Sequence, residues 1–289
     1  MAMKRVLITG ASGQIGLALY SLLENSTEYE VYRTKTLADL EAGIGALDIK
    51  DAISVKNGIE LIKPEIIINC AAMTAVDLCE SEQELAYQTN ALGPKYLAEA
   101  AEAIGATLVH LSSDYVFDGE ATHPYVEEDK PNPISVYGKS KQAGDEFVQK
   151  ACTKSFILRT AWVYGEGKNF VKTMLRLADS GNKIRVVADQ YGSPTSALEV
   201  ARVILFLMET RNYGIYHVTC EGITTWYSFA EEIFKMAGKE VDLEAIPSSE
   251  YVVPAKRPMY SVLDNKRLKN EHSYVMKNWQ DALKEYMSN

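Results

Sequence analysis

Short apolar runs alternate along the chain with longer segments in which apolar residues recur every three or four positions. The runs are rich in Val, Ile and Leu, as is typical of buried parallel strands. Strands are predicted at Arg5–Thr9, Glu30–Arg33, Glu65–Cys70, Thr107–Leu111 and Ser155–Arg159. Helices are predicted between them at Gln14–Glu24, Asp51–Ile62, Glu82–Ala103 and Ser140–Gln149. This alternation forms right-handed βαβ units, so we expect an α/β fold with a doubly wound, Rossmann-type parallel sheet.

The pattern changes after about Gly165. Helical segments there are separated by short strands, predicted at Lys183–Val187 and Gly214–Val218, and prolines interrupt the loops. We therefore expect residues 1–165 to form mainly a dinucleotide-binding lobe. Residues 166–289 are expected to form mainly a smaller C-terminal α/β lobe that binds the substrate, although the chain can cross between the lobes. Without a long linker, the two lobes should pack together and hold a ligand between them.

Composition excludes several classes of protein. The chain has 289 residues, 47% of them hydrophobic, and a formal net charge of −9, as in an ordinary globular protein. Basic residues do not cluster, so no nucleic-acid partner is expected. No apolar run reaches the roughly 18 residues of a membrane span, and the N-terminal segment lacks a secretory signal. The scattered cysteines and histidines predict neither a disulfide framework nor a metal site, which favours a cytoplasmic location.

The first candidate site is the glycine-rich turn Gly10–Gly16. It follows a predicted strand and opens a predicted helix, where the backbone can approach a pyrophosphate and the helix N-terminus supplies free N–H groups. A plain strand-to-helix turn is the alternative. Near the end of the second strand, where NAD-binding proteins carry a carboxylate, the chain has Arg33 and Lys35. Two cations favour the 2′-phosphate of NADPH, and a solvated basic loop is the alternative.

The second candidate site combines a tyrosine, a lysine and a serine hydroxyl. Tyr137 and Lys141 lie four residues apart at the start of a predicted helix, which places both on one face. A phenol, whose ordinary pKa is about 10, becomes an effective acid or base near neutral pH when a nearby ammonium and an oxidised nicotinamide lower that pKa. The segment Leu111–Tyr115 adds hydroxyls at the C-terminal end of a buried strand, where ligands bind in open α/β sheets. For the tyrosine and lysine alone, a surface helix is the alternative.

Together these motifs resemble the extended short-chain dehydrogenase/reductases. The resemblance covers nearly the whole chain and is carried by Gly10–Gly16, Asn69–Asp77, Ser112–Gly119, Pro133–Lys141, Arg159–Gly165, Asp189–Thr195 and Arg257–Pro258. It implies an oxidoreductase that reduces the C4 ketone of dTDP-4-dehydro-L-rhamnose to dTDP-L-rhamnose, in the supply of nucleotide sugar for cell-surface polysaccharide. NADPH is the implied cofactor, with NADH as the alternative.

The resemblance also implies roles for individual residues. Tyr137 would donate a proton to the developing alkoxide, Lys141 would hold the ribose, and Ser113, which stands where relatives mostly have threonine, would hydrogen-bond the same oxygen. The expected cofactor contacts, in which Gly10 and Arg33 come from the motifs above, are Gly10, Gly13, Gln14, Ile15, Arg33, Asp48, Ile49, Ala71, Ala72, Asn90, Tyr137 and Lys141. The expected substrate contacts are Val76, Asp77, Ser113, Tyr115, Trp162, Gln190 and Arg257. A helix-entry loop is the alternative for Asp48, and a core position is the alternative for Trp162.

Alternatives from the same family and from another class stay open. Sugar-nucleotide epimerases, dehydratases and other reductases share the tyrosine and lysine, but dehydratases follow the hydroxyl with an Asp-Glu pair, whereas Asp114 is followed here by Tyr115. A non-catalytic subunit similar to the regulatory β subunit of methionine adenosyltransferase is the other alternative, and the intact serine, tyrosine and lysine argue against it. Some family members dimerise through a magnesium ion held by a glutamate of the first helix. This chain has Ala18 there, so we expect a monomer, or a dimer without bridging magnesium.

Overall fold

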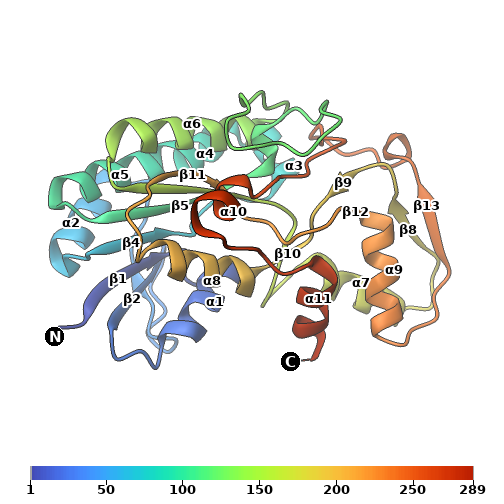
Figure 1. Cartoon of the computed structure of the whole chain (residues 1–289), viewed down its shortest axis with the longest axis horizontal. Helices are drawn as coiled ribbons and strands as arrows, with labels where there is room; N and C mark the ends of the chain where they lie inside the picture. The colour runs from blue at the N-terminus through green and yellow to red at the C-terminus, as the bar shows by residue number, and fades with distance from the viewer. Residues whose placement is uncertain (1, 289) are drawn as a thin grey trace.

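A seven-stranded sheet organises the larger lobe of the molecule (Figure 1). The computed structural model describes residues 2–288. The strands of this sheet are β1 (Lys4–Thr9), β2 (Tyr29–Lys35), β3 (Gly45–Ala46), β4 (Ile66–Asn69), β5 (Thr107–Ser113), β6 (Ser155–Thr160) and β11 (Gly214–His217). They lie in the order β11-β6-β5-β4-β1-β2-β3, and their pairings are parallel. The strand order reverses between β1 and β4, so the predicted doubly wound sheet is confirmed.

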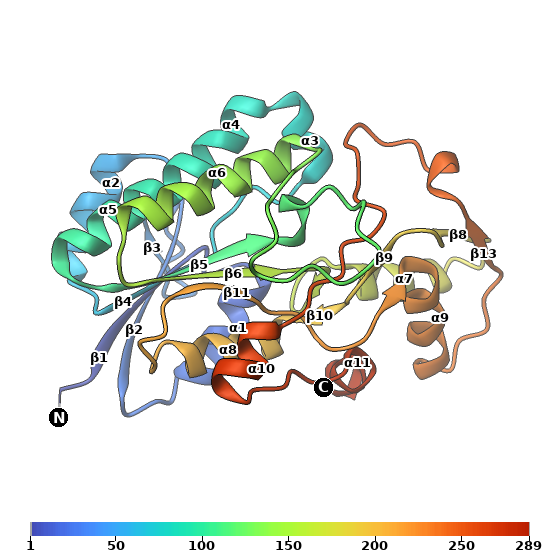
Figure 2. The same cartoon turned by 45° about the horizontal axis from the view of Figure 1, so that its top comes forward.

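Helices cover both faces of this sheet (Figure 2). The helices on one face are α2 (Ala52–Ile62), α5 (Gly93–Ile104) and α6 (Val136–Ala151). Those on the other face are α1 (Gln14–Leu23), α8 (Ala197–Leu207) and α10 (Lys266–His272). Leu7 packs against the first group, while Val6 and Ile8 pack against the second. Because successive strand residues point to opposite faces, a continuous apolar run such as that of β1 supplies both cores.

The predicted helix at Glu82–Ala103 consists of three pieces. α3 (Val76–Ser81) precedes it, and α4 (Gln83–Tyr87) leads into the π-helical turn η1 (Gln88–Leu92) and then into α5. Asn90 in this turn is fully buried, accepts a hydrogen bond from Met73 N at 2.8 Å and donates one to Met73 O at 3.1 Å. The π turn therefore directs Asn90 onto the loop that follows β4, as π turns at functional sites often do.

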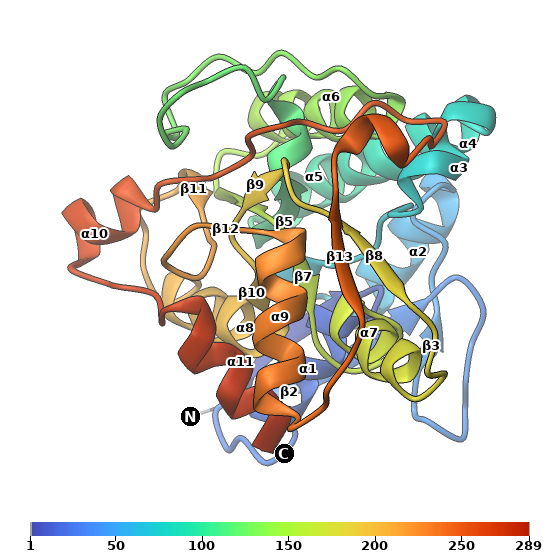
Figure 3. The same ribbon diagram turned by 90° about the vertical axis from the view of Figure 1, so that its right-hand side faces the viewer.

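The smaller lobe lies beyond the carboxyl ends of the sheet strands (Figure 3). Its helices are α7 (Phe170–Ala178), α9 (Trp226–Met236) and α11 (Trp279–Ser288). Its strand pairs are β8 (Ile184–Val187) with β13 (Leu243–Ile246), β7 (Val163–Tyr164) with β10 (Thr195–Ser196), and β9 (Tyr191–Gly192) with β12 (Thr224–Thr225). Their apolar side chains form a separate core. Two short 3-10 turns, η2 (Asp114–Val116) and η3 (Ser248–Glu250), begin the irregular segments that join the lobes.

The prediction that Gly214–Val218 belongs to the smaller lobe is wrong. β11 pairs in parallel with β6 at the edge of the large sheet, and Tyr216 is fully buried there. The chain thus returns to the large lobe with α8, β11 and α10. A short apolar run has the same local pattern in either lobe, since its strand partner lies far away in the sequence.

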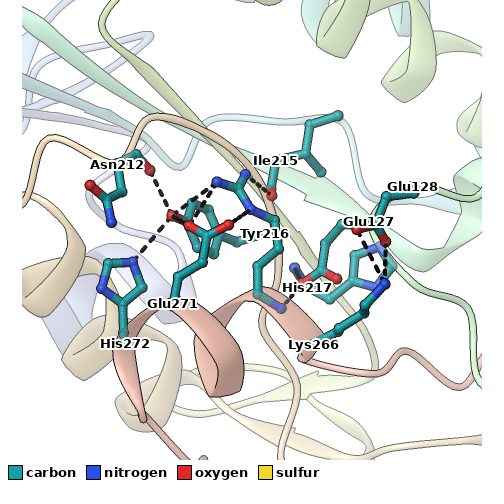
Figure 4. A network of polar contacts seen from close by, with 10 residues as sticks. Glu127, Glu128, Asn212, Ile215, Tyr216, His217, Lys266, Glu271 and His272 are labelled. Carbon is teal, nitrogen blue, oxygen red and sulfur yellow. Dashed lines mark hydrogen bonds and ion pairs between the residues drawn. The ribbon is translucent and has the colours of Figure 1, made fainter.

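A polar network closes the exposed edge of β11 (Figure 4). The guanidinium of Arg267 on α10 donates to Ile215 O at 2.8 Å and stacks on the ring of Tyr216. The carboxylate of Glu127 accepts hydrogen bonds from the backbone N–H groups of His217 and Arg267, both at 3.1 Å. The network protects the edge strand and anchors the irregular 116–133 segment that follows β5. Among residues 2–288, no helix is long and apolar enough to cross a membrane.

Candidate active site

The glycine-rich turn brings the start of α1 close to the ends of β1 and β4. Gly10 has φ +64°, and a Cβ atom on it would lie 2.6 Å from Ala71 Cα. A Cβ on Gly16 would lie 2.7 Å from Gly10 O, so a side chain is excluded at both positions. Gly13 stands at the N-cap of α1 without a side-chain cap, which leaves the backbone N–H groups of the first turn free for an anion.

A cavity of about 280 Å³ opens beside this turn. Six of the predicted cofactor residues line it: Gly10, Gly13, Asp48, Ile49, Ala71 and Ala72. Asp48 also forms an ion pair with Lys50 at 3.1 Å and accepts a hydrogen bond from Lys50 N, so it both lines the cavity and shapes the loop before α2. The predicted cofactor residue Asn90 does not line this cavity, and its side chain holds the loop at Met73 instead.

The cations that line this cavity differ from the predicted one. Arg33 stacks on the ring of Tyr20, donates a hydrogen bond to Ala42 O, and does not line the cavity. Lys35, at the end of β2, and Lys50 do line it, together with the side chains of Ser12 and Thr36. In the sequence, the pair Arg33 and Lys35 indicated a site for the 2′-phosphate. Of these two residues, only Lys35 lines the cavity.

A second cavity, of about 600 Å³, adjoins the first at Ser12 and Gly13. The predicted catalytic residues Ser113, Tyr137 and Lys141 all line it. The other predicted residues that line it are Gln14, Ile15, Ala72, Val76, Tyr115 and Trp162. The structure therefore brings the two sequence motifs to one continuous cleft at the carboxyl ends of the strands, where ligands bind in doubly wound folds.

The remaining predicted substrate residues, Asp77, Gln190 and Arg257, do not line this cavity. The guanidinium of Arg257 forms an ion pair with Asp77 at 2.8 Å and a hydrogen bond with the hydroxyl of Tyr115 at 3.4 Å. Gln190 is buried and donates to the hydroxyl of Ser248 at 3.0 Å. These contacts join α3 of the large lobe to the segments that follow β8 and β13.

Tyr137 and Lys141 lie on the buried face of the first turns of α6. The helix begins earlier than predicted, because the hydroxyl of Ser135 caps it by accepting a hydrogen bond from Gly138 N at 3.1 Å. Lys141 is 2% exposed, and its ammonium donates to Leu111 O at 2.6 Å. Burial lowers the pKa of Lys141 to about 8.

The hydroxyl of Ser113 connects three groups at the end of β5. It donates to Asp114 Oδ1 at 2.9 Å, accepts from Tyr115 N at 3.2 Å and is hydrogen-bonded to Tyr137. Burial raises the pKa of Tyr137, and the hydrogen bond with Ser113 opposes this effect only in part. In the protein without cofactor the pKa of Tyr137 is therefore not lowered, because the loss of hydration and the nearby carboxyl of Asp114 both raise it. Tyr137 is a neutral phenol at neutral pH, the form that can donate a proton.

Two residues of the cleft were missed by sequence reasoning. Trp226, at the start of α9, stacks on Trp162 with ring centroids 3.6 Å apart and lines the larger cavity. Trp162 has φ +48°, and Gly192 has no room for a side chain against its indole. This clamped conformation holds Trp162 at the cavity wall rather than in the core. Asp114 also lines the cavity, and burial raises the pKa of its carboxyl to about 6.

The cleft fits a dinucleotide. Gly10 and Gly13 bring bare backbone to the cavity wall, where a pyrophosphate can approach it, and Gln14 Oε1 beside them is buried without a hydrogen-bond partner. In the part of the chain that the structure describes, no three His, Cys, Asp or Glu side chains gather closely enough to hold a metal ion.

Comparisons with known proteins agree with this arrangement. The family described as RmlD substrate binding domain matches residues 3–289. A dTDP-4-dehydrorhamnose reductase of Aggregatibacter actinomycetemcomitans is 42% identical, with 98% of each chain covered. A spore coat polysaccharide biosynthesis protein of Bacillus subtilis, SpsK, is 40% identical over 99% of this chain and 97% of its own. The crystal structure of dTDP-4-dehydrorhamnose reductase from Bacillus anthracis in complex with NADP is 40% identical to this chain. It covers 99% of both chains with a TM-score of 0.93. The chain therefore belongs to the dTDP-4-dehydrorhamnose reductase family.

Proposed function

We propose that this protein reduces the C4 ketone of dTDP-4-dehydro-L-rhamnose to dTDP-L-rhamnose with NADPH. The observation that carries the proposal is the meeting of Ser113, Tyr137 and Lys141 in a cavity that adjoins the glycine-rich turn. A relative of the same length is named for this reaction, and another was solved with NADP.

The three residues divide the work on the ketone. The hydride that C4 accepts comes from the reduced nicotinamide when NADPH is bound. The hydroxyl of Tyr137 donates its proton to the carbonyl oxygen as charge develops there, and Ser113 holds the same oxygen in line with that proton. Protonated Lys141 stabilises the negative charge that Tyr137 acquires when it gives up its proton.

The residues around the cleft support a division between cofactor and substrate. The lining residues Asp48 and Ile49 suit the adenosine half of the cofactor, and Lys35 with Lys50 suits its 2′-phosphate. The stacked pair of Trp162 and Trp226 provides an apolar wall for the nucleotide sugar. On this proposal the large lobe binds mainly the cofactor, and the segments beyond residue 165 bind mainly the substrate.

We also propose a cellular location and an assembly state for the protein. A cytoplasmic location suits a biosynthetic reductase with free, buried thiols at Cys79, Cys152 and Cys220. Ala18 cannot ligate a metal, so we assign the protein as a monomer or as a dimer without bridging magnesium.

The decisive experiment mixes the purified protein with NADPH and dTDP-4-dehydrorhamnose, follows NADPH absorbance, and identifies the sugar product by NMR. One dTDP-L-rhamnose should form for each NADPH consumed. Conversion of the sugar without net NADPH oxidation would identify an epimerase instead. Binding of both ligands without turnover would identify a non-catalytic regulator.

A further inference from the structure

A buried charged network lies behind the tyrosine and lysine of the active site. Asp145 follows Lys141 by one turn of α6, and Arg159 lies on the neighbouring strand β6. Both Asp145 and Arg159 are 2% exposed, as is Lys141. Buried charges are costly unless they are paired, so this cluster needs an explanation.

The contacts of Asp145 reach the strands that end at the active site. Its Oδ2 accepts a hydrogen bond from the hydroxyl of Ser112 at 2.8 Å and lies 3.5 Å from Arg159 Nε. Its Oδ1 lies 3.7 Å from Nε2 of His110. Asp145 therefore connects α6 to β5 next to Ser113 and to β6 next to Thr160.

His110 is a neutral member of this network. Nδ2 of Asn69, an amide nitrogen that can only donate, contacts Nδ1 of His110 at 3.0 Å, which leaves the ring proton on Nε2 toward Asp145. Burial and the charge of Lys141 lower the pKa of His110 well below its ordinary value. The charged groups of the network are therefore the cations Lys141 and Arg159 and the anion Asp145.

We propose that Asp145 is a positioning residue for the reaction, whose buried carboxylate, one helical turn from Lys141, keeps the Lys141 ammonium charged. This inference rests on the proposed reductase function. The Lys141 ammonium donates to Leu111 O, which holds it against β5. Asp145 is the carboxylate whose charge favours the protonated form of Lys141. Arg159 competes for that carboxylate from β6.

The pKa shifts of Lys141 and Asp145 predict how activity depends on pH. Burial lowers the pKa of Lys141 to about 8, and the charge of Asp145 opposes the decrease. Burial raises the pKa of Asp145, while Arg159 and Lys141 favour its ionised form. Tyr137 and His110 also face Lys141, but both are neutral near pH 7. Lys141 is protonated below its pKa, so activity that depends on its charge should be lost as pH rises through about 8.

The test replaces Asp145 by its nearly isosteric amide. Asp145→Asn removes the carboxylate that opposes the effect of burial on Lys141, so the pKa of Lys141 should fall by about one unit or more. NMR titration of isotope-labelled lysine side chains in the cofactor-free protein measures this pKa directly, with the Lys141 signal identified by its loss in Lys141→Arg. The alkaline limb of the kcat profile should move to lower pH by a similar amount.

Matched variants separate charge from structure. Glu146→Gln removes a carboxylate from the exposed side of the same helix, where it pairs with Lys150, and should leave the Lys141 titration unchanged. Asp145→Glu should restore the wild-type titration. Arg159→Gln should raise the pKa of Lys141, because it leaves Asp145 to Lys141 alone.

Each result decides the proposal. A loss of thermal stability in Asp145→Asn with an unchanged Lys141 pKa and an unchanged alkaline limb would overturn it. If Asp145→Asn does not fold, the Arg159→Gln titration decides: a raised Lys141 pKa supports the role of Asp145, and an unchanged one overturns it. Because the titration needs no cofactor or substrate, a wild-type protein without reductase activity would contradict the proposed function and not the effect of Asp145 on Lys141.

Discussion

Burial acts in the same sense on both members of the tyrosine and lysine pair, because it favours the neutral form of each. It raises the pKa of Tyr137 and lowers that of Lys141 to about 8. The neutral phenol is the form that reduction requires, whereas the lysine must keep its charge to stabilise the phenolate that follows. Burial alone therefore keeps Tyr137 in the form that it needs, whereas Lys141 needs an opposing charge, and the carboxylate of Asp145 favours its protonated form.

Tyr137→Phe removes the proton donor and keeps the ring. We expect kcat to fall by about 10² to 10⁴-fold, the usual contribution of general acid catalysis, with little change in NADPH binding. Steady-state kinetics and a fluorescence titration with NADPH measure the two effects. Tyr87→Phe, an exposed tyrosine at the end of α4, serves as the matched control and should retain full activity. A loss of less than about fivefold would contradict the assignment of Tyr137 as the acid.

Lys35→Ala should change the choice of cofactor. Lys35 lines the cavity beside the glycine turn, so its loss should raise KM for NADPH by about tenfold, the size of one charge-assisted hydrogen bond, and leave KM for NADH nearly unchanged. Arg33→Ala is the comparison, since Arg33 stacks on Tyr20 and does not line the cavity. An equal rise of KM for both cofactors in Lys35→Ala would show that Lys35 does not contact the 2′-phosphate.

At the scale of elements, α6 places the catalytic pair by packing tightly on its neighbours. A side chain at Gly138 would meet the backbone carbonyl of Tyr115, and one at Gly144 would meet that of Asn90 in the π turn. The glycines thus allow the helix to approach η1 and η2 closely enough for Tyr137 and the hydroxyl of Ser113 to meet. Helix propensity alone would favour alanine at these positions.

Gly144→Ala should destabilise the protein although alanine is the better helix former. A gain of about 1 kcal/mol in helix propensity is outweighed by a clash with a backbone carbonyl that cannot rotate away, so we expect a net loss of about 1–3 kcal/mol. Urea unfolding measures this change. Gly58→Ala on α2 is the control, because its new methyl group meets only the end of the flexible Leu47 side chain, at 2.7 Å. Equal stability changes in both variants would show that the approach of α6 to the π turn is not limiting.

At the scale of the whole molecule, the two lobes are held together across the mouth of the cleft. Asp77 on α3 accepts hydrogen bonds from Ala255 N at 3.2 Å and from Arg257 at 2.8 Å, both on the segment that follows η3. This segment links the smaller lobe to the wall of the substrate cavity formed by Tyr115. The contact therefore sets how closely the lobes approach around a bound ligand.

Arg257→Gln should weaken substrate binding more than it slows the chemical step. Arg257 orients Asp77 and Tyr115 and supplies a cation near the cleft, so we expect KM for the nucleotide sugar to rise about tenfold or more with a smaller change in kcat. Arg185→Gln, an exposed arginine of the smaller lobe that pairs with Glu244 and Glu250, should change neither constant. A fall in kcat at constant KM would contradict a binding role for Arg257.

The sequence by itself determined the features that depend on local pattern. The alternation of apolar runs and helical segments predicts the order of strands and helices, because strand and helix periods are properties of neighbouring residues. The glycine spacing at Gly10–Gly16 predicts the cofactor turn, since only glycine fits there. The spacing of Tyr137 and Lys141 predicts that both lie on one face of a helix.

Only the tertiary structure decided which distant residues meet. It placed β11 in the large sheet, brought Lys35 rather than Arg33 to the cavity, stacked Trp226 on Trp162, and paired Asp145 with Arg159. None of these partners is close in sequence to the residue it contacts, so no local period carries the information. The balance of burial and charge that sets the pKa of each catalytic group depends on these long-range contacts, and it therefore appears only when the chain is folded.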